Sequence, residues 1–198
     1  MTRAQSMSTT VSDPPTVLVV DDEQDVADIY TLQLNERYTV ETVYGGRAAI
    51  DAVDETVDVM LLDRRMPDLS GNKVLEQVRA DGYDCRVIMV TAVDPKFDII
   101  EMPFDDYLCK PVDKETLYEA IEQQLTAKEY DETVSELFRA TSKLTVLESE
   151  MSNEELSSSA EYQRLKTMTT EMRTEAESLM TELNDFESAF KAIDRSSN

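Results

Sequence analysis

Residues 59–71 of the chain, VMLLDRRMPDLSG, decide its fold. The apolar run of residues 59–62 ends in Asp63, and the Pro, Asp, Ser and Gly residues that follow favour an immediate turn. This pattern predicts a buried strand that carries Asp63 at its carboxyl end. Ligands bind at the carboxyl ends of strands in open parallel sheets, so Asp63 is a candidate for chemistry. For one such aspartate alone, a structural role in capping the turn is the stronger interpretation.

Four further segments have the composition of strands, and helical patterns separate them. Together with residues 57–63, strands are expected at residues 16–20, 38–43, 86–91 and 106–110. Helices are expected at residues 25–37, 46–53, 72–80 and 114–125. Continuous apolarity within a strand indicates burial on both faces, which is typical of parallel sheets. The predicted fold class is therefore α/β, with a doubly wound five-stranded parallel sheet.

Polar side chains follow these strands at one edge of the predicted sheet. Asp21 and Asp22 end the first strand, Asp63 the third, Thr91 the fourth and Lys110 the fifth. Crowded carboxylates require a cation, and in a chain without His the hard oxygen ligands favour Mg²⁺. If Asp63 attacks a phosphoryl group, it forms an acyl phosphate, and Lys110 and the metal neutralise the transferring oxygens. Thr91 could donate a hydrogen bond to the new group.

Composition limits the function classes further. The formal net charge of −23 comes from 19 basic and 42 acidic residues, and both halves of the chain are acidic. This distribution indicates adaptation to a salt-rich cytoplasm, where salt screens the repulsion between like charges. It disfavours simple electrostatic binding to DNA. Cys85 and Cys109 form no disulfide framework, which fits a reducing cytoplasm, and no apolar stretch is long enough to predict a membrane span.

Five short motifs at these strand ends resemble the receiver domain of two-component response regulators. They are Asp21-Asp22, Asp63 with Met66-Pro67-Asp68 and Gly71, Thr91-Ala92, Asp105-Asp106-Tyr107, and Lys110-Pro111. The motifs occur in the family's order, and the resemblance covers residues 15–127. It implies a flavodoxin-like domain that is not an enzyme and that accepts a phosphoryl group from a sensor histidine kinase.

The resemblance also assigns roles to individual residues. It implies that Asp63 is the phosphoacceptor and that Mg²⁺ is held by Asp21, Asp22, Asp63 and the backbone carbonyl of Arg65. Thr91 and Tyr107 would be the switch residues, and Lys110 would pair with the phosphoryl group. The Lys110–Pro111 peptide bond is expected to be cis.

The segment between Thr91 and Lys110 departs from the family pattern. It is about three residues shorter than expected, and Pro95 and Pro103 interrupt any helix within it. The helix expected at this position is therefore short or irregular, which calls dimerisation through that face into question. The closing helix at residues 114–125 also lacks an Arg to pair with Asp106.

From residue 128 onward the sequence predicts two helices with heptad spacing. The apolar seam of the first is expected at Tyr130, Val134, Leu137, Thr141, Leu144, Glu148 and Met151, widened by Phe138 and Leu147. A Ser-rich stretch at residues 152–159 follows, with a capping box between Ser152 and Glu155. The seam of the second helix is expected at Tyr162, Leu165, Thr169, Met172, Ala176, Leu179, Leu183, Phe186, Phe190 and Ile193.

These helices are expected to form either an antiparallel hairpin or an intermolecular coiled coil, and the hairpin is favoured. Whether two hairpins also associate as a homodimer stays open. The acidic helical segment is similar to the HalX-type output segment of haloarchaeal response regulators. The predicted organisation is a disordered tail at residues 1–14, a receiver at 15–127 and a helical output or dimerisation segment at 128–198.

The sequence favours a phosphorylation-switched regulator in transcriptional or protein-interaction control, and two other classes stay open. A Mg-dependent aspartyl-nucleophile phosphatase would also use Asp63, but its second acid would fall at Arg65. A DNA-binding regulator acting through residues 128–198 would need clustered Lys and Arg, and these residues are scattered there.

Overall fold

A computed structural model of the chain describes residues 13–95 and 97–194, with side chains described up to residue 186. The tail predicted at residues 1–14 therefore lies almost wholly outside the described residues. The backbone forms two compact units, which meet between Lys114 and Glu115.

The first unit contains a five-stranded sheet in which every neighbouring pair is parallel. Its strands are β1 (Thr16–Val20), β2 (Thr39–Val43), β3 (Val59–Leu62), β4 (Arg86–Thr91) and β5 (Asp106–Cys109). Their order across the sheet is β2-β1-β3-β4-β5. The predicted fold class is confirmed, and all five strands lie within the predicted ranges.

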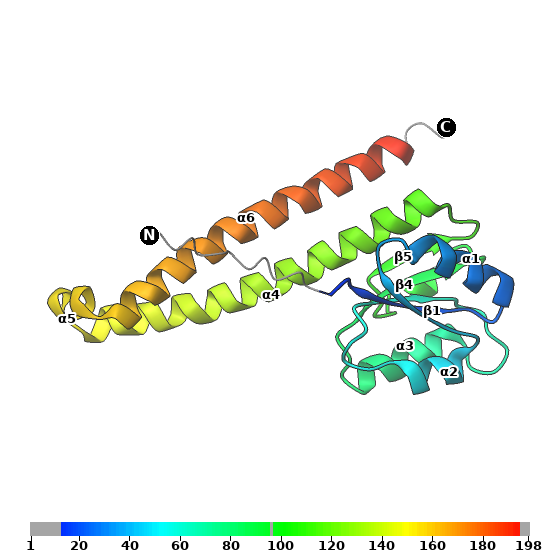
Figure 1. Cartoon of the computed structure of the whole chain (residues 1–198), viewed down its shortest axis with the longest axis horizontal. Coiled ribbons are helices and arrows are strands. Elements are labelled where there is room, and N and C mark those ends of the chain that lie inside the picture. Colours follow the sequence, from blue (N-terminus) through cyan, green and yellow to red (C-terminus); the bar gives the residue numbers. More distant parts are fainter. Residues whose placement is uncertain (1–12, 96, 195–198) are drawn as a thin grey trace, which may run out of the picture. The chain divides into compact units, whose positions relative to one another are not determined.

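Three helices lie between these strands: α1 (Gln24–Leu34), α2 (Gly46–Ala52) and α3 (Gly71–Ala80). Figure 1 shows α2 and α3 on one side of the sheet and α1 on the other. Alternate strand residues pack with α2 and α3 in one cluster, which includes Leu18, Val20, Met60, Leu62, Val87 and Met89. The intervening residues of β1 and β3 are equally buried. The strands are therefore covered on both faces, as their continuous apolarity predicts.

The connection between β4 and β5 has only a short helical turn within its described residues, the 3-10 helix η1 (Phe97–Ile99). The expectation of a short or irregular helix is confirmed here. Pro95 and Pro103 flank η1, and each lacks the backbone N–H that a longer helix would need.

Close backbone contacts fix the loop that follows β3. A Cβ atom at Gly71 would lie 2.1 Å from the carbonyl oxygen of Asp63, so no larger residue fits there without movement of the loop. Asp68 accepts hydrogen bonds from the backbone N–H groups of Gly46 (3.1 Å) and Arg47 (3.0 Å), which caps α2. The loop that follows Asp63 thus contacts α2 through Asp68, and Gly71 of α3 packs against Asp63.

The second unit consists of α4 (Lys114–Glu150), α5 (Asn153–Ser158) and α6 (Ala160–Asp194), with Lys114 itself assigned to the first unit. The closing helix predicted to end near Leu125 instead continues to Glu150, which corrects that boundary. The physical reason is that neither Gly nor Pro occurs after Pro111, so no residue stops the helix. The predicted capping box is present: Ser152 N–H donates to Glu155 Oε2 (2.9 Å), and Glu155 N–H donates to Ser152 Oγ.

The helices α4 and α6 run side by side in opposite directions as a hairpin (Figure 1). The hydroxyl of Tyr162 donates to Glu148 Oε1 across the hairpin at 2.8 Å. In α6 the described members of the predicted seam are buried or partly buried, and every position between them is exposed. The seam of α6 is therefore confirmed from Tyr162 to Phe186, while the side chains of Phe190 and Ile193 lie outside the described residues.

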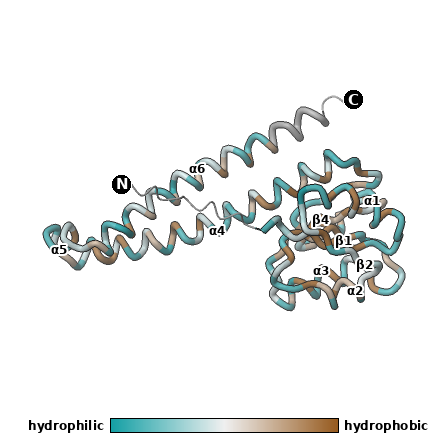
Figure 2. The backbone as a smooth tube through the Cα atoms, in the orientation of Figure 1, coloured by the Kyte–Doolittle hydropathy of each residue, from teal (hydrophilic) through white to brown (hydrophobic). Residues whose placement is uncertain are grey.

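The seam predicted for α4 is partly wrong. The less exposed positions along its hairpin part are Tyr130, Thr133, Leu137, Ala140, Thr141, Leu144 and Leu147. Val134 and Met151 are exposed, and Phe138 is 74% exposed. Glu148 is also exposed, but it does face α6, because its carboxylate accepts the hydrogen bond from Tyr162. Thr133 is partly buried and Ala140 is buried, but their side chains are small, so a count of hydrophobic residues overlooks them. In Figure 2, brown hydrophobic positions are concentrated in the sheet and recur only at intervals along the two long helices.

Candidate metal-binding site

Three aspartates meet at the carboxyl ends of β1 and β3. Asp21, Asp22 and Asp63 each offer a carboxylate oxygen, and these oxygens lie within 4.8 Å of one another. Asp21 is 3% exposed and Asp63 is 6% exposed, whereas Asp22 is more open to solvent. A cluster of this kind fits a small hard cation because it offers only oxygen ligands.

Lys110, directly after β5, places its ammonium group among these carboxylates. Its Nζ atom lies 2.6 Å from Asp21 Oδ2, 3.4 Å from Asp63 Oδ1 and 3.7 Å from Glu23 Oε1. Burial lowers the pKa of Lys110, but the hydrogen bond with Asp21 and the charges of Asp63 and Asp21 outweigh it, so the pKa is raised. The amine therefore stays charged beside the acids.

Hydrogen bonds from the backbone orient the two buried carboxylates. Arg65 N–H donates to Asp63 Oδ2 (2.8 Å), and Glu23 N–H donates to Asp21 Oδ1 (3.0 Å). Burial raises the pKa of Asp63, and the charge of Lys110 and the Arg65 hydrogen bond oppose that rise. One oxygen of Asp63 is thus held in place, and the other faces Lys110.

The end of β4 is tied to the segment around Lys110. Thr91 is fully buried, and its carbonyl oxygen accepts a hydrogen bond from Lys110 N–H at 2.9 Å. The half-buried Tyr107 donates its hydroxyl to the carbonyl of Val93 (2.6 Å). The Lys110–Pro111 peptide bond is cis. The two expected switch residues therefore lie on neighbouring strands, and Tyr107 contacts the chain just beyond Thr91.

Sequence reasoning missed Arg64, which directly follows Asp63. Its side chain forms an ion pair with Asp98 in η1, and its Nε donates to Asn72 Oδ1 in α3 at 3.2 Å. The hydrogen bond with Asp98, helped by Tyr107, raises the pKa of Arg64 above its ordinary value despite burial. Reading residues 64–71 only as a turn gave no signal for these contacts.

Tyr30 of α1 was also missed. Burial raises the pKa of its hydroxyl, and the charges of Lys110, Asp21 and Asp63 act on it. Its sequence signal was helical spacing alone, which indicated a core residue.

An arginine pair fixes the start of β5. Arg79 (2.7 Å) and Arg86 (3.0 Å) both form ion pairs with Asp105, and Val87 N–H donates to the same carboxylate. The neighbouring Asp106 instead accepts a hydrogen bond from Tyr107 N–H, and burial raises its pKa. Of the two acids in this motif, Asp105 therefore forms ion pairs with arginines, whereas Asp106 is partly buried and accepts a backbone hydrogen bond.

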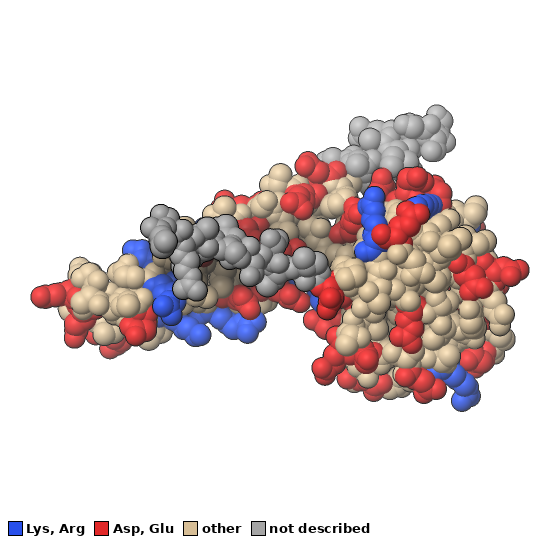
Figure 3. Space-filling view, viewed as in Figure 1, with Lys and Arg blue, Asp and Glu red and all other residues tan. Residues whose placement is uncertain are grey.

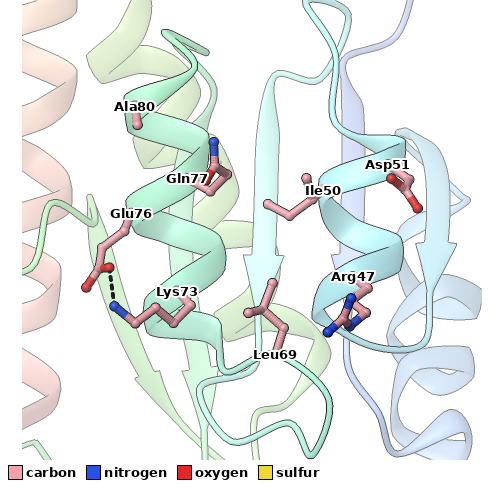
Figure 4. A pocket seen from close by; sticks show the side chains of 8 residues that line it. All are labelled: Arg47, Ile50, Asp51, Leu69, Lys73, Glu76, Gln77 and Ala80. Carbon is pink, nitrogen blue, oxygen red and sulfur yellow. Dashed lines mark hydrogen bonds and ion pairs between the residues drawn. The ribbon is translucent and has the colours of Figure 1, made fainter.

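A groove lies elsewhere, between α2 and α3. It is lined by both helices and Leu69, and Figure 4 shows the Lys73–Glu76 ion pair on one wall and Arg47 on the other. These residues are separate from the acidic cluster. Figure 3 shows Asp and Glu side chains spread over both units of the protein.

A parallel α/β sheet that gathers two buried acids, a threonine and a lysine at its carboxyl edge defines a receiver-type signalling domain. Comparison with known families supports this class directly. Residues 17–122 match the response regulator receiver domain, and residues 126–192 match the HalX domain. The chain therefore belongs to the response regulator receiver family and carries a HalX output segment, as both resemblances predicted.

Known relatives agree with this assignment. A protein of Haloferax volcanii named "Putative transcriptional regulator" is 50% identical over 134 residues, which are 67% of this chain and 23% of that protein. The matched residues thus span less than a quarter of that relative's length.

Solved structures with similar folds are receiver domains. The CheY-like response regulator receiver domain protein from Methanospirillum hungatei JF-1 is 26% identical, with a TM-score of 0.55 over 60% of this chain and 99% of that one. The receiver domain of the Francisella response regulator 1452 is 28% identical, with a TM-score of 0.51 over 56% of this chain and 96% of that one.

Receiver domains bind Mg²⁺ at an acidic pocket, and the oxygen cluster of Asp21, Asp22 and Asp63 has the composition such a site needs. Response regulators are generally signalling proteins and not enzymes. Among the described helices, none combines the length and apolar composition required to cross a bilayer.

Proposed function

We propose that this response regulator accepts a phosphoryl group on Asp63 from a sensor histidine kinase and passes the signal to its HalX segment. The observation that carries the proposal is the position of Lys110, whose ammonium lies within 3.4 Å of Asp63 and 2.6 Å of Asp21. A nucleophilic carboxylate beside a fixed cation and two further acids suits phosphoryl transfer.

In the proposed reaction, a carboxylate oxygen of Asp63 attacks the phosphorus of a phosphohistidine. The new P–O bond forms as the P–N bond breaks, and the histidine leaves and takes up a proton. Lys110 neutralises charge on the transferring oxygens. Asp21, Asp22, Asp63 and the carbonyl of Arg65 would hold Mg²⁺, which supplies further charge neutralisation when bound. The backbone N–H of Arg65 keeps the carboxylate of Asp63 oriented for attack.

The switch residues act after transfer. Thr91 donates a hydrogen bond to the phosphoryl group and moves toward it. Tyr107, whose hydroxyl bonds the Val93 carbonyl two residues beyond Thr91, then changes its position. The bistable element is thus the short connection between β4 and β5, which both residues contact.

The HalX segment provides the output, in transcriptional control through contacts with other proteins. The haloarchaeal relative supports a role in transcription. Charge favours protein partners over DNA, because residues 128–198 contain twice as many acidic as basic residues. The exposed Phe138 and Val134 on α4 offer an apolar face for a second hairpin, so a homodimer through the helices belongs to the proposal. Neither Cys85 nor Cys109 forms a disulfide, which fits a cytoplasmic protein.

The test is labelling by a small phosphodonor, such as acetyl phosphate, in the presence of Mg²⁺. Asp63→Asn is expected to abolish labelling, since the amide cannot act as the nucleophile. Asp51→Asn, an exposed position on α2, serves as the matched control and is expected to label like the native protein. Labelling that persists in Asp63→Asn would refute the assignment.

A further inference from the structure

Arg64 connects the phosphoacceptor strand to the irregular segment between β4 and β5. It is covalently next to Asp63, and its side chain is only 11% exposed. Its guanidinium pairs with Asp98 in η1 and donates to Asn72 in α3. A single cation thus holds three elements together at the edge of the sheet where the phosphoryl group would arrive.

Asp98 and a phosphoryl group on Asp63 would differ in how strongly they attract Arg64. Asp98 is about half exposed, and an ion pair with a solvent-exposed carboxylate contributes little. A phosphoryl group offers more charge and three acceptor oxygens, and a guanidinium binds such groups with two parallel hydrogen bonds. A phosphoryl group on the adjacent residue therefore competes favourably with Asp98 for Arg64.

We propose that Arg64 exchanges Asp98 for the phosphoryl oxygens on Asp63, so that loss of the Arg64–Asp98 ion pair releases η1 and carries the signal to its surface. The proposal rests on the proposed function and assigns a positioning role to Arg64. It also assigns Asp98 the role of a competitor that holds η1 in the unphosphorylated state.

The turn that contains Asp98 carries an exposed apolar surface. Phe97 is 91% exposed and Ile100 is 74% exposed, and Pro95 and Ile99 join them around one shallow apolar depression. Because Asp98 lies between Phe97 and Ile99, releasing its ion pair would move this surface directly. Among its described residues, the shortened connection contains no helix longer than η1 that could hold this turn in place.

The experiment measures the affinity of the full chain for beryllofluoride, a phosphoryl mimic, with Mg²⁺ by fluorine NMR. Asp98→Asn removes the competitor and is expected to tighten binding about two- to five-fold, the range of a half-exposed ion pair. Arg64→Gln is expected to weaken binding. Arg64→Lys keeps the charge without the planar fork, so its affinity is expected to lie between those of Arg64→Gln and the native protein.

The decisive comparison is the double variant. In the Arg64→Gln background, Asp98→Asn is expected to leave the affinity unchanged, because the competition acts only through Arg64. Glu101→Gln removes an exposed negative charge from the same segment and is the control for general electrostatics. It is expected to bind the mimic like the native protein.

Three results would overturn the proposal: native affinity in Asp98→Asn, equal tightening with and without Arg64, or the same tightening in Glu101→Gln. Failure of the proposed function would look different. In that case the bound fluorine signal would be missing from the native chain or would persist in Asp63→Asn.

A reporter on the turn gives an independent readout. The chain contains no Trp, so Phe97→Trp introduces a single Trp, which can be excited selectively over the tyrosines, at an exposed position. Its emission is expected to change on adding beryllofluoride, and Asp98→Asn is expected to show that change before the mimic is added. Emission that is insensitive to the mimic while binding is intact would contradict the release of η1.

Discussion

The receiver unit and the helical hairpin bury their residues in different ways. Strands β1 and β3 are covered on both faces, so almost every side chain in them has one permitted environment. Between residues 129 and 186 the hairpin buries one narrow seam, and most of the positions in this part of α4 and α6 face solvent. A residue in these strands is therefore buried whichever face of the sheet it points to. A residue in the hairpin part of α4 is buried only where the turn of the helix places it in the seam.

The largest expected effect comes from the doubly covered sheet. Leu61→Ala removes a side chain that is 2% exposed and is expected to lower the free energy of unfolding of the receiver unit by about 2–5 kcal/mol. Leu179→Ala in the α6 seam is the matched change in the hairpin and should cost less, because the positions on either side of Leu179 are exposed. Hydrogen exchange at amides of β3 and α6 separates the two effects. Equal losses would show that the hairpin is buried as deeply as the sheet.

A second prediction tests the register of α4. Ala140→Glu places a charge in the buried seam and is expected to lower the stability of the hairpin by about 1–3 kcal/mol. At protein concentrations low enough to keep the hairpin monomeric, Phe138→Glu, two residues away on the exposed side, is expected to change it by less than about 0.5 kcal/mol. Thermal unfolding followed by circular dichroism measures both. A cost for Phe138→Glu that rises with protein concentration would place Phe138 in an interface between two copies.

The capping box between α4 and α5 is a smaller contribution. Ser152→Ala removes the acceptor for Glu155 N–H and is expected to destabilise the hairpin by about 0.5–2 kcal/mol. Ser149→Ala, on the exposed last turn of α4, is the control. If the two variants melt alike, the cap does not contribute to joining the helices.

The smallest effect is expected at Asp106. Burial raises the pKa of this carboxyl, so its ionised form opposes folding above that pKa and the opposition disappears as the pH falls through it. Asp106→Asn is therefore expected to raise the melting temperature at neutral pH, and the gain should shrink in mildly acidic buffer. Asp84→Asn, an exposed acid, is the control. A gain that is independent of pH would assign the effect to something other than ionisation.

The same contrast explains what the sequence could predict. Asp21, Asp63, Thr91 and Lys110 could be placed at one edge because each directly follows, or ends, an apolar run, and parallel strands bring their ends together. Thr133 and Ala140 could not be placed in the seam, since small residues carry little hydrophobic signal.

The contacts of Arg64 were beyond sequence reasoning for another reason. Its partner Asp98 lies 34 positions further along the chain, in a connection whose path depends on two prolines and not on a regular element. The helix boundary near residue 125 was misplaced because a domain border was expected to interrupt the helix, and no residue there does so.

The most direct test of the central claim is to locate the phosphoryl group. After treatment with a small phosphodonor and Mg²⁺, borohydride reduction converts an aspartyl phosphate into homoserine, and peptide mass spectrometry identifies its position. We expect homoserine at residue 63 and at neither residue 21 nor residue 22. Homoserine at either of those positions, or at none of the three, would contradict the claim that Lys110 and the acidic cluster prepare Asp63 for phosphorylation.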